Sequence, residues 1–233
     1  MEQMKAVRLT TRDGKRSPEL RHEPIPKPDR HQVLIRVHAT SLNFRDQALL
    51  SHQPIVATSK DIVPLSDGAG EVVAIGEDVS RAKVGDRVAA NCFVHWISGP
   101  FVPEYQTASL GLSTDGMLTE YAVLHENAVV HLPASISYIE AAALPCAAGA
   151  AWSSLNLASP LQPGQTVLIQ GTGGVALFAL QIAKMFGARV LAITSSDEKA
   201  AKLKELGAEA VVNYNTFPDW DREILALTDG LRC

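Results

Sequence analysis

Hydrophobic and polar residues follow different rhythms in the two halves of this chain. In the first half, residues 32–40 alternate with a period of two, with Val33 and Ile35 on one face, which predicts a strand. Two shorter runs bounded by glycines, at 70–76 and 85–90, predict further strands. Residues 93–116 are rich in Gly, Pro, Ser and Thr, which predicts a long loop.

The second half predicts alternating helices and strands. A helix-prone stretch at 137–158 is interrupted by Pro145, which predicts a break or kink. In the predicted helix at 195–207, Ser195 suits the N-terminal cap and Gly207 the C-terminal stop. Strand followed by helix followed by strand is typical of a parallel sheet with right-handed crossovers. The remaining predicted elements are strands at 166–170, 188–194 and 208–214 and a last helix at 219–230.

Composition narrows the function classes. The 233 residues are 46% hydrophobic and carry a formal net charge of −4, with no basic run, so neither nucleic acid nor an anionic membrane is an expected partner. No apolar run has signal-peptide or membrane-span length. Cys92, Cys146 and Cys233 lie far apart, without metal-type spacing or an even-numbered disulfide set. These features predict a reduced, cytoplasmic protein.

The predicted strand at 166–170 ends in a glycine turn that opens a helix. Gly171, Gly173 and Ala176 fit the pattern G-x-G-x-x-G/A, with Gly174 and Val175 between them. Glycines allow a tight turn and close approach of the backbone to a pyrophosphate, while a small third residue lets helix and strand pack. The helix N-terminus offers free N–H groups to the anion. The context favours dinucleotide binding over a tight turn without a ligand.

The end of the next predicted strand indicates which dinucleotide is bound. Thr194, Ser195 and Ser196 stand where an acidic residue would bind the ribose diol of NAD. Hydroxyl groups and the nearby Lys199 suit a 2′-phosphate, so NADP is favoured over NAD. Asp197 lies nearby and is consistent with NAD as the alternative cofactor, although an acid in the first turn of a helix is also favoured by the helix dipole. The two serines also suit simple helix capping.

Several ordered motifs resemble one family. They are "HATSLNFRD", "IVPLSDGAGEVVAIGEDV", "KVGDRV", "DGMLTEYAV", "PGQTVLIQGTGGV" and "KLKELGA". Together they resemble the medium-chain dehydrogenase/reductase superfamily, in its zinc-independent, quinone-oxidoreductase-like branch. The resemblance implies an α/β protein: a GroES-like, mostly β catalytic domain over 1–125 and an NAD(P)-binding Rossmann domain with a doubly wound parallel sheet over 126–233. It also implies an active site in the cleft between these domains.

The same resemblance implies that zinc is not used. Zinc-using relatives carry a catalytic Cys in the first motif and a His-Glu pair in the second, where this chain has Asn43 and Ser66-Asp67. Neither Asn43 nor Ser66 is a good zinc ligand. The four cysteines of the relatives' structural zinc site are absent. His95 lies near one Cys, which is more typical of a surface or packing residue than of a metal ligand.

In that branch, hydride passes from the reduced nicotinamide to an electron-poor C=C bond, quinone or carbonyl, and the protein positions donor and acceptor. The resemblance implies that Asn43 lies near nicotinamide and substrate, while Asp46 fixes the loop. Tyr214 corresponds to a residue near the adenosine phosphate, although a strand-end aromatic that packs on the sheet is equally consistent. Ala48 and Ala150 depart from an aromatic residue and a Thr of many relatives, which leaves the small-molecule substrate open.

The chain ends where relatives continue into a fourth Rossmann strand. We therefore expect a Rossmann domain that is incomplete at its C-terminus, with an exposed sheet edge. A frameshift, a premature stop and a genuine short form remain open, as does the oligomeric state. Besides a doubtful NADPH-dependent activity, the alternatives are a non-catalytic nucleotide- or partner-binding remnant and a gene fragment that folds poorly.

Overall fold

The chain divides into two compact units in a computed structural model, Met1–Cys146 and Ala147–Cys233. This division differs from the predicted domain boundary between residues 125 and 126. Residues 126–146 stay with the first unit because their strand and helix join its sheet. The structure describes residues 2–12, 15–51, 61–157, 159–228 and 230.

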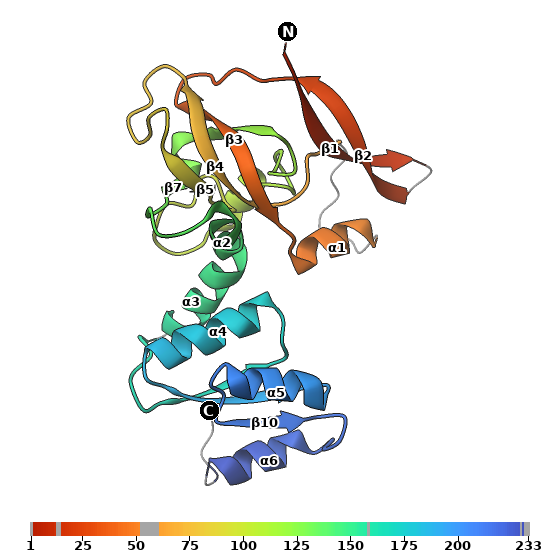
Figure 1. The fold of residues 1–233 in the computed structure, drawn as a ribbon, viewed down its shortest axis with the longest axis vertical. Helices are drawn as coiled ribbons and strands as arrows, with labels where there is room; N and C mark the ends of the chain where they lie inside the picture. The colour runs from red at the N-terminus through yellow and green to blue at the C-terminus, as the bar shows by residue number, and fades with distance from the viewer. Residues whose placement is uncertain (1, 13–14, 52–60, 158, 229, 231–233) are drawn as a thin grey trace. The chain divides into compact units, whose positions relative to one another are not determined.

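The first unit is built on antiparallel strands (Figure 1). A five-stranded sheet has the order β6-β3-β4-β5-β7, and a separate hairpin pairs β1 with β2. The alternating run predicted at 32–40 is confirmed as β3, and the two shorter runs lie in β4 and β5. The strands are β1 Gln3–Arg12, β2 Lys15–Pro24, β3 Gln32–Ser41, β4 Asp67–Ile75, β5 Arg87–Ala90, β6 Tyr121–His125 and β7 Val129–His131.

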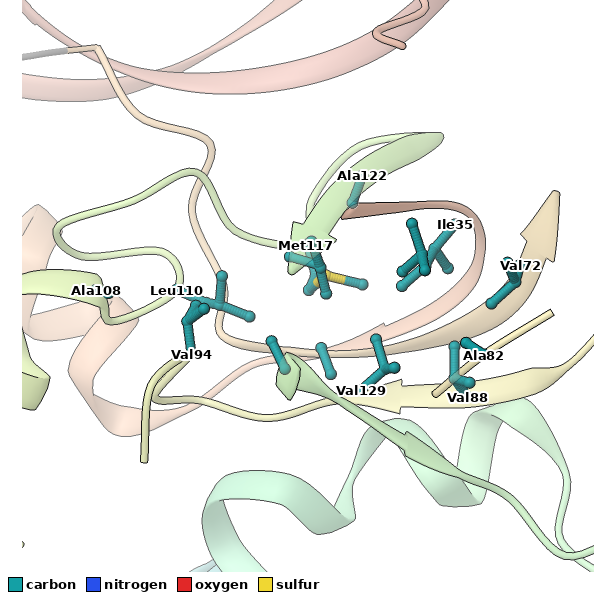
Figure 2. Close-up of a cluster of buried hydrophobic side chains, with 14 residues drawn as sticks. Ile35, Val72, Ala82, Val88, Val94, Ala108, Leu110, Met117, Ala122 and Val129 are labelled. Carbon is teal, nitrogen blue, oxygen red and sulfur yellow. The ribbon is translucent and has the colours of Figure 1, made fainter. Parts of the chain in front are cut away.

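One cluster of buried side chains forms the main core of this unit. The cluster contains Ile35 from β3, Val72 from β4 and Val88 from β5 together with Met117, and Figure 2 shows Ile35 between Met117 and Val72. Val33 and Ile35 are almost completely buried, as the period of two predicts. The sheet therefore presents one continuous apolar face, and the loops that follow its strands carry the polar groups described below.

Short helices connect the strands of the first unit. The predicted long loop at 93–116 contains one of them, a 3₁₀ helix, and is otherwise irregular. The hairpin β1–β2 and helix α1 were not predicted, because neither segment shows a clear periodic pattern. The helices are α1 Phe44–Leu50, η1 Pro103–Ala108, η2 Glu126–Ala128 and α2 Tyr138–Ala142.

Pro145 interrupts the helical stretch at 137–158, as predicted. The helix α2 ends before it, a π-helical turn η3 spans Leu144–Ala148, and α3 continues over Gly149–Asn156. Proline removes a helical N–H and its ring clashes with the preceding turn, so the backbone widens at this point. No helix in the described ranges is long and apolar enough to cross a bilayer.

The second unit is a three-stranded parallel sheet with the order β10-β9-β8. The alternation along β9 buries Val190 and Ala192 against α4 and α5, and Leu191 and Ile193 against α6. Helices thus cover both faces, which confirms the mixed α/β class and the partial Rossmann sheet. The elements are β8 Thr166–Gln170, α4 Gly174–Met185, β9 Arg189–Thr194, α5 Asp197–Glu205, β10 Ala210–Asn213 and α6 Trp220–Leu227.

The outer edge of β8 borders a groove. Within the described part of the chain, β8 pairs only with β9. A groove of about 570 Å³ follows its other edge, lined by Thr166 and Leu168 of the strand, Leu155 of α3 and Trp220 and Ile224 of α6. Apolar side chains of two helices therefore flank an unpaired strand edge.

Candidate functional site

The glycine turn has the backbone geometry expected of a pyrophosphate site. Gly171 has φ +82°, a left-handed conformation that glycine adopts without steric cost. Gly173 is the N-cap of α4, and a Cβ added at Gly171 or Gly173 would meet no atom within 4 Å. The first helical bond runs from the N–H of Leu177 to the carbonyl of Gly173, so the N–H groups of Gly174 and Val175 precede it.

Packing behind this turn agrees with the third motif position. Ala176 is partly buried against the cluster that joins α4 to β8 and β9, whereas the Val175 side chain is 44% exposed. A small residue at 176 brings helix and strand together, while Gly174 and Val175 stay at the surface. The space beside Gly171 and Gly173 is therefore open.

Three of the predicted phosphate-binding residues lie together after β9. Lys199 Nζ donates to Ser195 Oγ over 3.2 Å, and Ser196 Oγ accepts from the Lys199 backbone N–H over 3.3 Å. The N-cap of α5 is thus Ser196, and the sequence prediction of Ser195 as the cap was wrong. Because Ser196 caps the helix, the hydroxyl of Ser195 lies beside the ammonium group, and donors of both residues remain at the surface.

Thr194 and Tyr214 differ in accessibility. Thr194 is 1% exposed, so its side chain lies in the interior, and its carbonyl accepts the Tyr214 backbone N–H over 2.9 Å. The Tyr214 side chain is 39% exposed at the end of β10. The structure therefore keeps Ser195, Ser196, Lys199 and Tyr214 near solvent and excludes the Thr194 hydroxyl from that surface.

In the first unit, Asn43 begins α1. Its backbone N–H donates to Asp46 Oδ2 over 2.8 Å, which fixes the turn before the helix and gives Asp46 the role expected for it. Burial raises the pKa of the Asp46 carboxyl. The amide nitrogen Nδ2 of Asn43 is buried and has no hydrogen-bond partner among the described residues. A buried donor without a partner is rare in folded proteins, and a ligand or a water would complete its hydrogen bonding.

Arg45 ties α1 to the loop after η1. Its Nη1 donates to Ser109 Oγ over 3.1 Å and lies 3.3 Å from Cys92 Sγ, and its Nη2 donates to the Leu110 carbonyl. Both terminal nitrogens of the guanidinium group therefore bond within the protein, while its buried Nε has no partner among the described residues. This network holds the segment that carries Asn43 against the core of the unit.

Ser66, Asp67 and Cys146 form a second polar group. Ser66 Oγ donates to Asp67 Oδ1 over 2.5 Å, and the backbone N–H of Cys146 donates to Asp67 Oδ2 over 3.0 Å. Ser66 and Asp67 are at most 1% exposed. Both carboxylate oxygens of Asp67 are thus engaged by the chain. Leu65, just before them, has φ +70°, and such strain in a non-glycine residue clusters at functional sites.

This donor set does not suit zinc. Burial, together with the neighbouring Asp67, raises the pKa of the Cys146 thiol to about 11, so its thiolate is disfavoured. Asn43 and Ser66 are poor zinc ligands, and Asp67 already accepts two hydrogen bonds. Among the described residues, no group of three His, Cys, Asp or Glu side chains is arranged to hold a metal ion.

Sequence reasoning missed Arg45 and Cys146. Arg45 lies inside a quoted motif, but nothing in the pattern shows that its charge turns inward. Cys146 follows Pro145, and a break in a helix frees backbone N–H groups. That signal was present in the sequence, although its partner Asp67 lies 79 positions away.

Comparisons with known proteins agree with this arrangement. Residues 29–134 match the alcohol dehydrogenase GroES-like domain, and residues 174–233 match the zinc-binding dehydrogenase domain. A solved structure from Sinorhizobium meliloti 1021, assigned as an alcohol dehydrogenase, is 36% identical with a TM-score of 0.91. The alignment covers 99% of this chain and 68% of that one. The chain belongs to the medium-chain dehydrogenase/reductase superfamily.

Curated members of the superfamily include both zinc-type and quinone-reducing proteins. A zinc-type alcohol dehydrogenase-like protein of Schizosaccharomyces pombe is 40% identical over 86% of this chain and 58% of its own length. A quinone oxidoreductase of Pseudomonas aeruginosa is 33% identical over 98% of this chain and 64% of its own length. The chain thus spans about 60% of these relatives. The superfamily uses NAD(P), and its relatives here are alcohol dehydrogenases and quinone oxidoreductases.

Proposed function

We propose that the protein is an NADPH-dependent reductase that acts on a small electron-poor substrate, an activated C=C bond, a quinone or a carbonyl, without zinc. The observation that carries the proposal is the open glycine turn at Gly171 and Gly173 in a chain of this superfamily. Bound NADPH would supply the hydride. The chain's own residues would bind the cofactor, orient the substrate and exclude water.

The nucleotide would be held by groups of the second unit. The N–H groups of Gly174 and Val175 would bind the pyrophosphate, because they precede the first hydrogen bond of α4. Ser195, Ser196 and Lys199 would bind the 2′-phosphate, since an ammonium group and two hydroxyls are donors for an anion. Tyr214, which is exposed beside them, would contact the adenosine end.

Asn43 would act on the substrate or the nicotinamide. Its buried Nδ2 could donate to a substrate oxygen on which negative charge develops during reduction, which fills the hydrogen bond that it lacks. Zinc would not be needed for this step, because Asn43 would supply the donor itself, while Ser66 and Asp67, at the other zinc positions of metal-using relatives, bond to each other. The proposal therefore separates this protein from its zinc-type relatives.

The 233-residue chain should be titrated with NADPH by fluorescence and then assayed for NADPH oxidation with a quinone and with an enone. Saturable binding followed by turnover supports the proposal, provided that elemental analysis after dialysis against a chelator finds no stoichiometric zinc. Binding without turnover favours the non-catalytic alternative. Absence of binding overturns the proposal.

A substitution at Asn43 tests its role. Asn43→Ala should lower the turnover number about 100-fold, as removal of one such donor does in other enzymes, and should leave NADPH affinity nearly unchanged. Asn43→Ser is the matched control, because serine also caps a helix but is too short to place the same donor. Full activity in Asn43→Ala would remove this residue from the chemistry.

A further inference from the structure

An acidic side chain lies close to the predicted 2′-phosphate site. Asp197 is the first residue of α5 and follows the pair Ser195 and Ser196 directly. A carboxylate in this region can accept the 2′- and 3′-hydroxyls of an unphosphorylated ribose, and it repels a phosphate dianion. The direction in which this carboxylate is held therefore bears on the choice between the two cofactors.

The structure turns Asp197 toward the end of β10. Asn213 Nδ2 donates to Asp197 Oδ1 over 2.8 Å, between residues 16 positions apart. The Asn213 amide is itself oriented, because its Oδ1 accepts the backbone N–H of Asn215 over 3.1 Å. The Asn213 carbonyl accepts the N–H of Phe217 over 2.8 Å, which fixes the turn after the strand. The hydrogen bond to Asp197 therefore comes from a well-positioned donor.

A second asparagine engages the same turn without touching a carboxylate. Asn215 Nδ2 donates to the Ser195 carbonyl over 2.8 Å. Together with the bond from the Tyr214 N–H to the Thr194 carbonyl, this contact joins the ends of β9 and β10. The backbone carbonyls of Thr194 and Ser195 thus accept hydrogen bonds from residues that follow β10. Lys199 Nζ and Ser195 Oγ bond to each other on the remaining side.

We propose that Asn213 is a positioning residue that sets cofactor preference. By binding Asp197, it keeps the carboxylate from the ribose 2′ position and leaves Lys199 and Ser195 as the groups that meet the nucleotide there. The inference rests on the proposed function, since it concerns the same nucleotide site. It predicts that the preference for NADP over NAD depends on Asn213, the partner of Asp197, and not only on Lys199.

The test uses the 233-residue chain and two probes that differ only in the 2′-phosphate, 2′,5′-ADP and 5′-AMP. Calorimetry gives the ratio of their dissociation constants for wild type, Asn213→Ala, Asp197→Asn and the double variant. Asn213→Ala should shift the ratio about tenfold toward 5′-AMP, because a freed carboxylate repels phosphate. In the Asp197→Asn background the same substitution should leave the ratio unchanged.

Asn215→Ala is the matched control, because it removes an amide donor from the same turn without freeing a charge. It should weaken both probes equally, as a merely structural role would. A ratio for Asn213→Ala equal to that of wild type overturns the inference, whichever probe wild type prefers. If the wild-type chain binds 5′-AMP as tightly as 2′,5′-ADP, the proposed preference for NADPH is overturned instead. If the chain binds neither probe, the inference about Asn213 and the proposed NADPH preference are both overturned.

Discussion

The polar groups around Asn43 and those after β9 are organised in opposite ways. In the first unit, Asp67 receives hydrogen bonds from Ser66 and Cys146, and these groups are withdrawn from solvent. In the second unit, Lys199 and Ser195 lie near solvent, beside a glycine turn with open surroundings. In the first arrangement both carboxylate oxygens of Asp67 are bonded within the protein, while the second presents donors to a ligand.

Because of this difference, substitutions in the first region should lower the stability of the fold, and substitutions in the second should lower nucleotide affinity. Removal of a group from the enclosed cluster leaves a buried partner without its hydrogen bond, which costs folding free energy. Removal of a group from the open turn exposes nothing that was buried, so the fold should tolerate it. Asn43 belongs to the enclosed region but keeps one unpaired donor, as Arg45 does at Nε, and the family resemblance favours Asn43 as the candidate for chemistry there.

The largest effect on nucleotide binding is expected for Gly173→Asp. A side chain at this position meets open space, and aspartate is a good N-cap, so the melting temperature should stay equal or rise. The new carboxylate would repel the pyrophosphate, and NADPH affinity should fall about 100-fold or more. Calorimetry and a melting curve on the same sample measure both effects. Gly173→Ala, which adds no charge, should bind much better than Gly173→Asp.

The converse variant is Asp67→Ala. It leaves the Cys146 N–H and the Ser66 hydroxyl without their acceptor in the interior, so the free energy of unfolding should fall by about 2–4 kcal/mol. Chemical denaturation of the first unit measures the loss. Affinity for 2′,5′-ADP should not change, because that site belongs to the second unit. Asp67→Asn keeps an acceptor and should lose less, and an equal loss would argue against the hydrogen bonds as the cause.

Lys199→Ala tests whether Lys199 binds the 2′-phosphate. NADPH affinity should fall by a factor of about 10–100, through loss of a charge-assisted contact, while NADH affinity should change little. Lys202→Ala is the control, since Lys202 lies on the same helix and pairs with Glu198 at 3.5 Å. Equal losses for the two cofactors would remove Lys199 from the phosphate site.

Glu126→Gln should have the smallest effect, and this effect should depend on pH. Backbone N–H groups of Ser80 and Arg81, together with His31, hold the pKa of the Glu126 carboxyl at about 2, below its ordinary value of 4.5. This stabilisation is therefore present above pH 4.5 and is lost as the pH falls toward 2. At pH 7 the variant should lose about 1–2 kcal/mol of stability, and the difference should shrink in acid. Denaturant titrations at several pH values measure it, and a difference that does not change with pH would argue against the carboxylate as its cause.

Sequence reasoning located the open region better than the enclosed one for a physical reason. The glycine turn depends on residues a few positions apart, and one motif contains all of them, whereas the cap of α5 was predicted one residue too early, at Ser195. Even there, the contact between Asn213 and Asp197 was missed, because it joins the end of β10 to the start of α5, 16 positions away. The polar cluster of the first unit depends on pairs that are distant in sequence, such as Asp67 and Cys146. Local patterns carry no record of such pairs.

The groove beside β8 has a consequence for the solvent exchange of individual amide protons. The N–H of Gly171 donates to Ile193, and Gln165 accepts from Arg189, so odd-numbered positions along β8 face β9. The amides of Thr166, Leu168 and Gln170 therefore point toward the groove. Deuterium should enter these three positions quickly and the intervening ones slowly, which gives a labelling pattern with a period of two. The exchange rates of successive amides of β8 would then show which side of the strand is protected from solvent.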